Sequence, residues 1–271
     1  MQHASDQWHV AILVVLLSLI IVVRILLGRH GAAPFIRRIA GLNAIDEAVG
    51  RATEMGRPVV MVPGISGLDI VTLQALSIFS YVARNVARFG NRTIVPTIDG
   101  LTTGVAQETL RDAYADSGRP DLFHEDDVRY LTDQQFPFAL GVAGLLTRER
   151  AAASFLFGTF AAEALIMAEV GQEVGAVQIA GTPSTTQIPF FIAACDYVII
   201  GDEYYAATAY ISRDRTLLGS IVGQDYCKLI LLAVALLGCV AFTWYQWLTQ
   251  HHHAGPLIEH LKYIVNYFKP G

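Results

Sequence analysis

The pattern of hydrophobic positions contains two long runs, one near each end of the chain. Residues 8–27 carry a single charge, Arg24, and as a helix they would rise about 30 Å, which matches the hydrocarbon core of a bilayer. Residues 229–248 carry no charge and include Trp244 and Trp247, aromatic residues that favour a membrane interface. Both runs are therefore predicted to span a membrane as helices.

A cleaved signal peptide is the alternative interpretation of the first run. The residues before it, 1–7, contain Asp6 and no Lys or Arg, and no small-residue cleavage site follows the run. An uncleaved anchor is therefore the preferred interpretation, and Arg24 is expected to reach the headgroups from its position near the helix end.

Between the two runs, β-branched segments alternate with turn residues and helix-length segments. This alternation is typical of an α/β fold with a mainly parallel sheet and helices on its faces, Rossmann-like and doubly wound. A helix is predicted over residues 44–55, with Asn43 as its cap and Gly56 as its stop. The predicted strands are residues 58–62, 93–97, 128–131, 154–157, 176–180 and 197–200.

This region also contains two unusually apolar segments and three predicted helix caps. Residues 136–146 and 188–200 are unusually apolar and are interpreted as buried helices or helix–strand pairs, with re-entrant membrane segments as the alternative. Three loops carry the spacing of a capping box, in which a side chain binds an amide at the start of a helix. The predicted boxes are Ser66 with Asp69, Thr132 with Gln135, and Ser184 with Gln187.

The domain organisation follows from these patterns. After the second run, residues 256–269 place apolar side chains on one helical face, which predicts an amphipathic helix on a membrane surface or a partner. The three histidines before it are interpreted as a polar linker and not a metal site. The predicted segments are an anchor (1–28), a membrane-surface connector and helix (29–56), a cytoplasmic α/β domain (57–226), a second transmembrane helix (227–249) and an extracytoplasmic tail (250–271).

Charge sets the predicted orientation. The net charge is −5, but cations follow the first run and precede the second, whereas the outer flanks are poor in Lys and Arg. By the positive-inside rule, the central domain is expected in the cytoplasm of a bacterial cell and both termini outside the inner membrane. No basic patch indicates nucleic-acid binding, and the three cysteines show no metal-like spacing. The cations in question are Arg29, Arg37, Arg38, Arg213, Arg215 and Lys228.

Candidate chemistry lies in the loops that follow the predicted strands, because ligands of parallel sheets bind at the carboxyl ends of the strands. The segment PGISGLD lacks the second glycine of a nucleophile elbow around Ser66, and His124 is the only histidine between the first strand and the second run, so a Ser-His-Asp hydrolase is not expected. No phosphate-binding loop motif occurs, and no cofactor, metal or catalytic set is predicted. The tentative ligand-binding residues are Ser66, Asp99, Thr132, Glu163, Thr182, Ser184 and Glu203.

The strings QIAGTPSTTQIPFFIAACDY and IIGDEYYAATAY, together with GRPVVMVPGISGLD, resemble an uncharacterised bacterial membrane-anchored family. The similarity covers most of residues 56–228. It implies a recurring arrangement of a cytoplasmic α/β domain beside membrane helices, and it implies no activity or catalytic residue.

Two classes of function remain. The preferred hypothesis is a non-enzymatic assembly or accessory protein that associates with itself or with a larger membrane complex. The alternative is a membrane-tethered domain that binds or acts on a small anionic or lipid-derived ligand at the strand-end loops.

Overall fold

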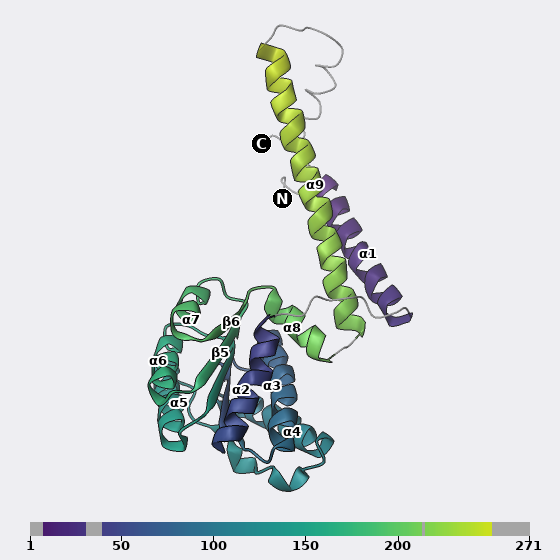
Figure 1. The fold of residues 1–271 in the computed structure, drawn as a ribbon. Helices are drawn as coiled ribbons and strands as arrows, with labels where there is room; N and C mark the ends of the chain where they lie inside the picture. The colour runs from purple at the N-terminus through teal and green to yellow at the C-terminus, as the bar shows by residue number, and fades with distance from the viewer. Residues whose placement is uncertain (1–7, 31–39, 213–214, 251–271) are drawn as a thin grey trace. The chain divides into compact units, whose positions relative to one another are not determined.

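A computed structural model describes residues 8–30, 40–212 and 215–250, which form two compact units (Figure 1). One unit, within residues 35–214, is an α/β fold. The other contains two long helices, α1 (Trp8–His30) and α9 (Arg215–Gln250). The predicted amphipathic helix 256–269 and the three histidines lie outside the described residues. Each unit is described by itself below.

The α/β unit is built on a six-stranded sheet in which every pairing is parallel, in the order β3-β2-β1-β4-β5-β6. All six predicted strands are confirmed, with ends that move by two residues at most. The two central strands, β1 and β4, are almost entirely buried because helices cover both faces of the sheet. The strands are β1 (Val59–Gly64), β2 (Thr93–Thr97), β3 (Val128–Tyr130), β4 (Ala153–Thr159), β5 (Val177–Thr182) and β6 (Tyr197–Ile200).

The helices divide between the two faces of the sheet (Figure 1). The apolar runs 136–146 and 188–200 become α5 and the pair α7–β6, so the helix and helix–strand interpretation is confirmed. Two short 3-10 helices, Pro120–Leu122 and Glu125–Asp127, precede β3. On one face lie α2 (Ala40–Met55), α3 (Ile70–Arg88), α4 (Gly100–Asp116) and α8 (Glu203–Ser212), and on the other α5 (Gln135–Glu149), α6 (Ala164–Val174) and α7 (Ile188–Ala194).

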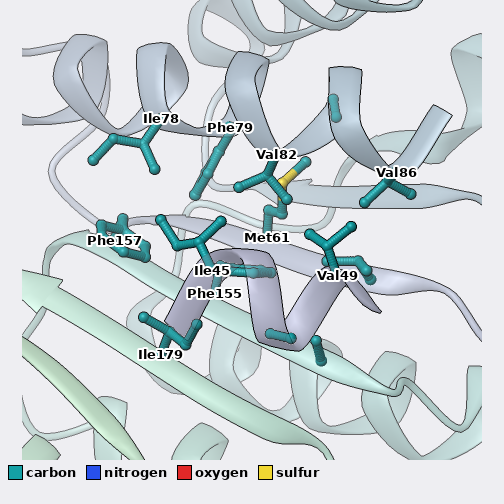
Figure 2. Packing of buried hydrophobic residues seen from close by; sticks show 14 of the residues in the cluster. Ile45, Val49, Met61, Ile78, Phe79, Val82, Val86, Phe155, Phe157 and Ile179 are labelled. Carbon is teal, nitrogen blue, oxygen red and sulfur yellow. The ribbon is translucent and has the colours of Figure 1, made fainter. Parts of the chain in front are cut away.

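The protein has two hydrophobic cores, one on each face of the sheet, because successive side chains of β1 point to opposite faces. Val59 and Met61 point to the face covered by α2 and α3, whereas Val60 and Val62 point to the face covered by α5, α6 and α7. Figure 2 shows the first core, in which Phe79 of α3 lies over the sheet; its ring meets that of Phe157 edge to face at 6.2 Å. Burying an aromatic or branched side chain of this kind contributes roughly 1.5–3 kcal/mol.

The predicted helix starts were wrong in detail. The cap of α3 is Asp69, not Ser66, and neither Thr132 nor Ser184 caps α5 or α7, whose first helical residues follow Gln134 and Gln187. The capping pattern is local, whereas the start of each helix depends on how the sheet seats it, so the pattern located the loops but not the caps.

The helix α2 also starts earlier than predicted. It begins at Ala40, so Asn43 lies inside the helix and is not its cap, because residues 40–42 contain no proline that would stop a helix. Its predicted stop is confirmed, since Gly56 adopts a φ of 61° directly after Met55.

Three described helices are long and apolar enough to cross a membrane by length and composition: residues 10–28 of α1, α3, and residues 215–244 of α9. Half of the α3 window is buried inside the α/β unit, so its apolar character is explained by packing on the sheet. Of the corresponding windows of α1 and α9, only 0% and 6% are buried inside the protein. The helix α9 starts at Arg215, well before residue 227, where we placed the second span.

Candidate functional site

The strand order reverses between β1 and β4, and this reversal defines the candidate site. In open parallel sheets, ligands bind outside the carboxyl ends of the strands at such a reversal. Because all six strands are parallel, every loop with a predicted site residue emerges at the same edge, which we call the carboxyl edge.

Close backbone approach joins β1 and β4 at this edge. Gly64 has a φ of 91° and Gly158 a φ of 149°, and a Cβ on either would lie closer than 3.0 Å to backbone atoms of the other strand. Beyond the glycines, the Ile65 amide donates to the Thr159 carbonyl at 2.9 Å. Only glycine allows the two chains to lie this close, so the first part of each loop is held against the other strand.

The loop after β1 is folded around its own hydrogen bonds. Asp69 accepts from the Thr72 amide at 2.7 Å and caps α3, and the Thr72 hydroxyl donates to the Gly67 carbonyl at 2.6 Å. Burial raises the pKa of Asp69, but hydrogen bonds from Thr72 and Ser66 outweigh it and leave the pKa below the ordinary value. Ser66 itself is exposed, with its hydroxyl 3.5 Å from that of Thr72.

The loop after β2 is closed in the same way. Asp99 accepts from the amide and the hydroxyl of Thr102, at 2.8 Å and 2.5 Å, and caps α4. A Cβ built on Gly67 would lie 3.5 Å from Oδ2 of Asp99, so the loops of β1 and β2 are neighbours. The structure therefore brings Ser66 and Asp99 into adjacent loops, each held by the cap of its own helix.

Glu163 occupies the loop after β4 and is completely buried. Its Oε1 accepts from the Ala161 amide at 2.7 Å, and its Oε2 accepts from the side-chain amide of Gln135 at the start of α5. The carboxylate thus joins the loop of β4 to α5. The glutamate six residues later, Glu169, is exposed, so the two do not form an acid pair.

The other predicted site residues have local roles. The Thr132 hydroxyl accepts from the Gln134 amide at 3.3 Å, and the Thr182 hydroxyl accepts from the Ser184 amide at 3.2 Å. Glu203 is exposed in the first turn of α8. Across residues 40–212, no hydrogen bond or ion pair joins Thr132 or Glu203 to another predicted site residue.

The loops of the carboxyl edge carry acidic and neutral polar side chains but no basic ones. The segments between the strands and their helices contain carboxylates, hydroxyls and amides, but no Lys, Arg or His. Asp69 and Asp99 occupy helix-start amides that would otherwise attract an anion. Among the described residues, no group of three or more His, Cys, Asp or Glu side chains could hold a metal ion. In these segments the carboxylates are therefore the only ionisable side chains, and no cationic side chain is present to bind a phosphoryl group.

A hollow of about 270 Å³ lies at the opposite, amino edge of the sheet, and the sequence did not indicate it. Its lining includes Arg51, Gln178, Cys195 and Asp196. Gln178 is buried and donates to the Ala168 and Ala194 carbonyls at 2.7 Å and 3.1 Å. Burial raises the pKa of the Cys195 thiol to about 12, with a further contribution from the Asp196 carboxylate, so the thiol stays protonated at neutral pH. In the sequence, the polar residue Gln178 within an otherwise apolar strand was the only sign of this hollow.

Large apolar side chains surround the carboxyl edge. Among the first three residues of each helix that follows β1 to β5, one large apolar side chain is exposed, and we call this set the apolar rim. Its members are Ile70, Leu101, Phe136, Leu165 and Phe190, with exposed fractions of 70, 66, 53, 43 and 47%. Two of these side chains belong to helices on one face of the sheet and three to helices on the other.

In the second unit, α1 and α9 pack side by side through glycines. A Cβ on Gly28 would lie 3.2 Å from a backbone atom of α9, and Cβ atoms on Gly219 and Gly223 would lie 3.0–3.1 Å from backbone atoms of α1. Small residues four apart allow helix backbones to approach in this way. The Arg24 guanidinium lies 4.1 Å from the centre of the Tyr226 ring, a cation–π contact that the sequence did not reveal.

Comparison with known proteins adds the family. A search of curated proteins and a search of solved structures each found no significant match. A family model described as "Domain of unknown function (DUF6754)" matches residues 2–253, which include α1, the whole α/β unit and α9. The chain therefore belongs to the DUF6754 family, a domain of unknown function.

Proposed function

We propose that this protein is a membrane-anchored assembly or accessory protein, which packs through its exposed apolar surface against copies of itself or a larger membrane complex. The apolar rim is the observation that carries this proposal. Five exposed apolar side chains at one edge would be costly in a free monomer and are typical of a surface that a partner covers.

The carboxyl-edge loops also support a non-enzymatic role. Asp69 and Asp99 cap helices and Glu163 joins the loop of β4 to α5, and the segments between the strands and their helices carry no cation that would bind a small anionic ligand. The residues at this edge are thus better suited to hold a rigid docking surface than to transform a substrate.

In this proposal, α1 and α9 are the membrane anchors. With 23 residues, α1 would rise about 35 Å, and with 36 residues, α9 would rise about 54 Å, which exceeds the roughly 40–45 Å of a bilayer with its headgroups. Part of α9 therefore extends beyond the membrane. The cations beside the two anchors favour a cytoplasmic α/β unit and extracytoplasmic termini in a bacterial inner membrane.

The test is a native mass measurement of the full chain extracted from its membrane in a mild detergent. We expect particles larger than one 29.5 kDa chain plus detergent, containing either further copies or a partner. A monodisperse single chain with no partner would refute the proposal.

Two rim variants, Leu101→Gln and Phe136→Gln, then test the docking surface. Each should weaken association by about fivefold or more, as expected when a central apolar contact is lost. Phe89→Gln is the matched control, because Phe89 is equally exposed but lies at the C-terminal end of α3, at the opposite edge. Equal effects of rim and control variants would exclude the apolar rim as the surface.

A further inference from the structure

The hollow at the amino edge gathers side chains from both faces of the sheet, and the proposed function uses none of them. Arg51 lines it from α2 on one face, and Gln172 lines it from the last turn of α6 on the other. Cys195 and Asp196 come from the connection between α7 and β6. The described lining thus comes from three separate segments of the α/β unit.

Small residues leave the space that forms the hollow. Gly175, Ala176, Ala193 and Ala194 line it with at most a methyl group each. Its volume of about 270 Å³ is just below the roughly 300–1,000 Å³ of pockets that bind drug-sized molecules. A ligand of this hollow is therefore a molecule with few non-hydrogen atoms.

Gln178 fixes two walls of the hollow relative to each other. Its Nε2 donates to the Ala168 carbonyl of α6 and to the Ala194 carbonyl at the end of α7. Its Oε1 is buried and accepts no hydrogen bond from any residue that the structure describes. The helix α6 makes room for this oxygen with Gly171, since a Cβ there would collide with it. A buried acceptor without a donor is unfavourable, so a bound molecule that brings a donor is favoured here.

Two opposite charges line the hollow without forming an ion pair. Arg51 is exposed and forms no hydrogen bond or ion pair with any described residue of the chain. Asp196 is also exposed; its Oδ2 accepts from the Gln178 amide at 2.8 Å, whereas its Oδ1 has no partner within the described ranges. One carboxylate oxygen and a whole guanidinium group are thus available to a ligand.

The helices that end at the hollow add a negative potential on one side. The helix α6 ends at Val174 and α7 at Ala194, and the C-terminal end of a helix carries a partial negative charge. Together with Asp196, these helix ends attract a cationic group and repel an anion. Arg51 has the opposite preference. The hollow therefore presents complementary contacts for the two charged groups of one zwitterion.

We propose that the hollow at the amino edge binds a small α-amino acid, whose carboxylate pairs with Arg51 and whose ammonium group donates to Asp196 and to the carbonyl end of α6. A simple carboxylate would face the negative helix ends, and a simple amine would face Arg51, so an α-amino acid is preferred to either. This site lies within the α/β unit and requires neither a membrane nor a partner protein, so it goes beyond the proposed function.

Isothermal titration of the full chain in detergent, with each genetically encoded amino acid in turn, tests the binding. At least one amino acid with a small side chain, such as glycine, alanine or serine, should bind and raise Tm by about 2–4 °C at about five times its Kd. Acetate and methylammonium each carry only one of the two charges and should bind about tenfold more weakly or worse. The proposal is overturned if no amino acid binds, or if acetate or methylammonium binds as tightly.

Arg51→Gln and Asp196→Asn test the two charged contacts. Neither should disturb the fold, because Arg51 has no partner to lose within the described residues and an asparagine oxygen still accepts from the Gln178 amide. Each should weaken the affinity for the amino acid about tenfold or more. Arg88→Gln is the matched control, because Arg88 is also exposed and lies at the same edge, at the end of α3, but does not line the hollow. Unchanged affinity in either hollow variant, or an equal loss in the control, would contradict the site.

Alkylation of Cys195 locates the bound molecule. Cys195 is partly buried and lines the hollow, so a bound amino acid should slow its reaction with N-ethylmaleimide severalfold. Peptide masses distinguish this label from the label on Cys239, which is exposed on α9 and should react at the same rate with and without the amino acid. In Arg51→Gln the same concentration should protect Cys195 less. Binding that leaves the reaction of Cys195 unchanged would place the amino acid elsewhere and overturn the proposal.

Discussion

Replacing Gly158 by alanine tests whether the close approach of β1 and β4 holds the carboxyl edge together. At a φ of 149° an alanine is strained, at a cost of roughly 1–3 kcal/mol. Its Cβ would also lie closer than 3.0 Å to the Pro63 carbonyl, and backbone atoms at the centre of a sheet cannot move aside as a flexible side chain can. Overpacking of this kind adds roughly 1–3 kcal/mol, so the total destabilisation is about 2–6 kcal/mol.

Gly90→Ala is the matched control for this prediction. Gly90 has a φ of 80°, but a Cβ there would meet nothing within 4 Å. This substitution should therefore cost only the backbone strain of a left-handed residue, about 1–2 kcal/mol. The comparison separates the effect of strand packing from that of backbone conformation.

Thermal unfolding of the full chain is the assay, followed by near-ultraviolet circular dichroism at wavelengths where the tyrosines of the α/β unit absorb. In a domain of roughly 150–250 residues, each kcal/mol lowers Tm by about 2–4 °C. Gly158→Ala should thus lower Tm by about 4–24 °C, and by more than Gly90→Ala, for which the same conversion gives about 2–8 °C. Equal shifts would refute the argument that the two strand backbones exclude a side chain.

Two further predictions concern Cys195 and the strand-end loops. Burial raises the pKa of Cys195 from an ordinary 9.0 to about 12, so its contribution to stability is complete below pH 9 and is lost as the pH rises towards 12. Between pH 9 and 10.5, Tm should fall more steeply in the unaltered chain than in Cys195→Ala, and parallel curves would contradict this. Ser184→Ala and Glu203→Gln should each change stability by less than about 0.5 kcal/mol, because the Ser184 hydroxyl pairs with that of the neighbouring, exposed Thr186 and Glu203 is exposed. A small-molecule screen by thermal shift checks the same residues: a ligand response that these changes abolish would favour the alternative function of a ligand-binding domain.

The strands and the two long apolar helices were predictable because their signals are local and repeated. A β-branched run such as residues 93–97 alternates its side chains between two buried faces, and both faces require apolar residues. Similarly, a run of twenty apolar residues predicts a helix without reference to any neighbour.

Residues of the candidate site were predictable only as a group. Their types and their place after each strand predict one common edge, and the structure has them there. Their roles depend on neighbours that are far away in sequence: Glu163 is bound by Gln135 from α5, and the loop of Asp99 lies beside that of Gly67. The capping boxes failed for the same reason, since a four-residue pattern does not specify where a helix is seated on the sheet.

The sequence by itself determined the parallel α/β class, the six strands and the two long apolar helices, because each follows from periodicity within a single segment. Only the tertiary structure decided the strand order, the apolar rim and the register of α1 beside α9. These features depend on which segments meet, and that is settled by packing between distant parts of the chain, such as Gly64 with Thr159 or Cys227 with Leu17.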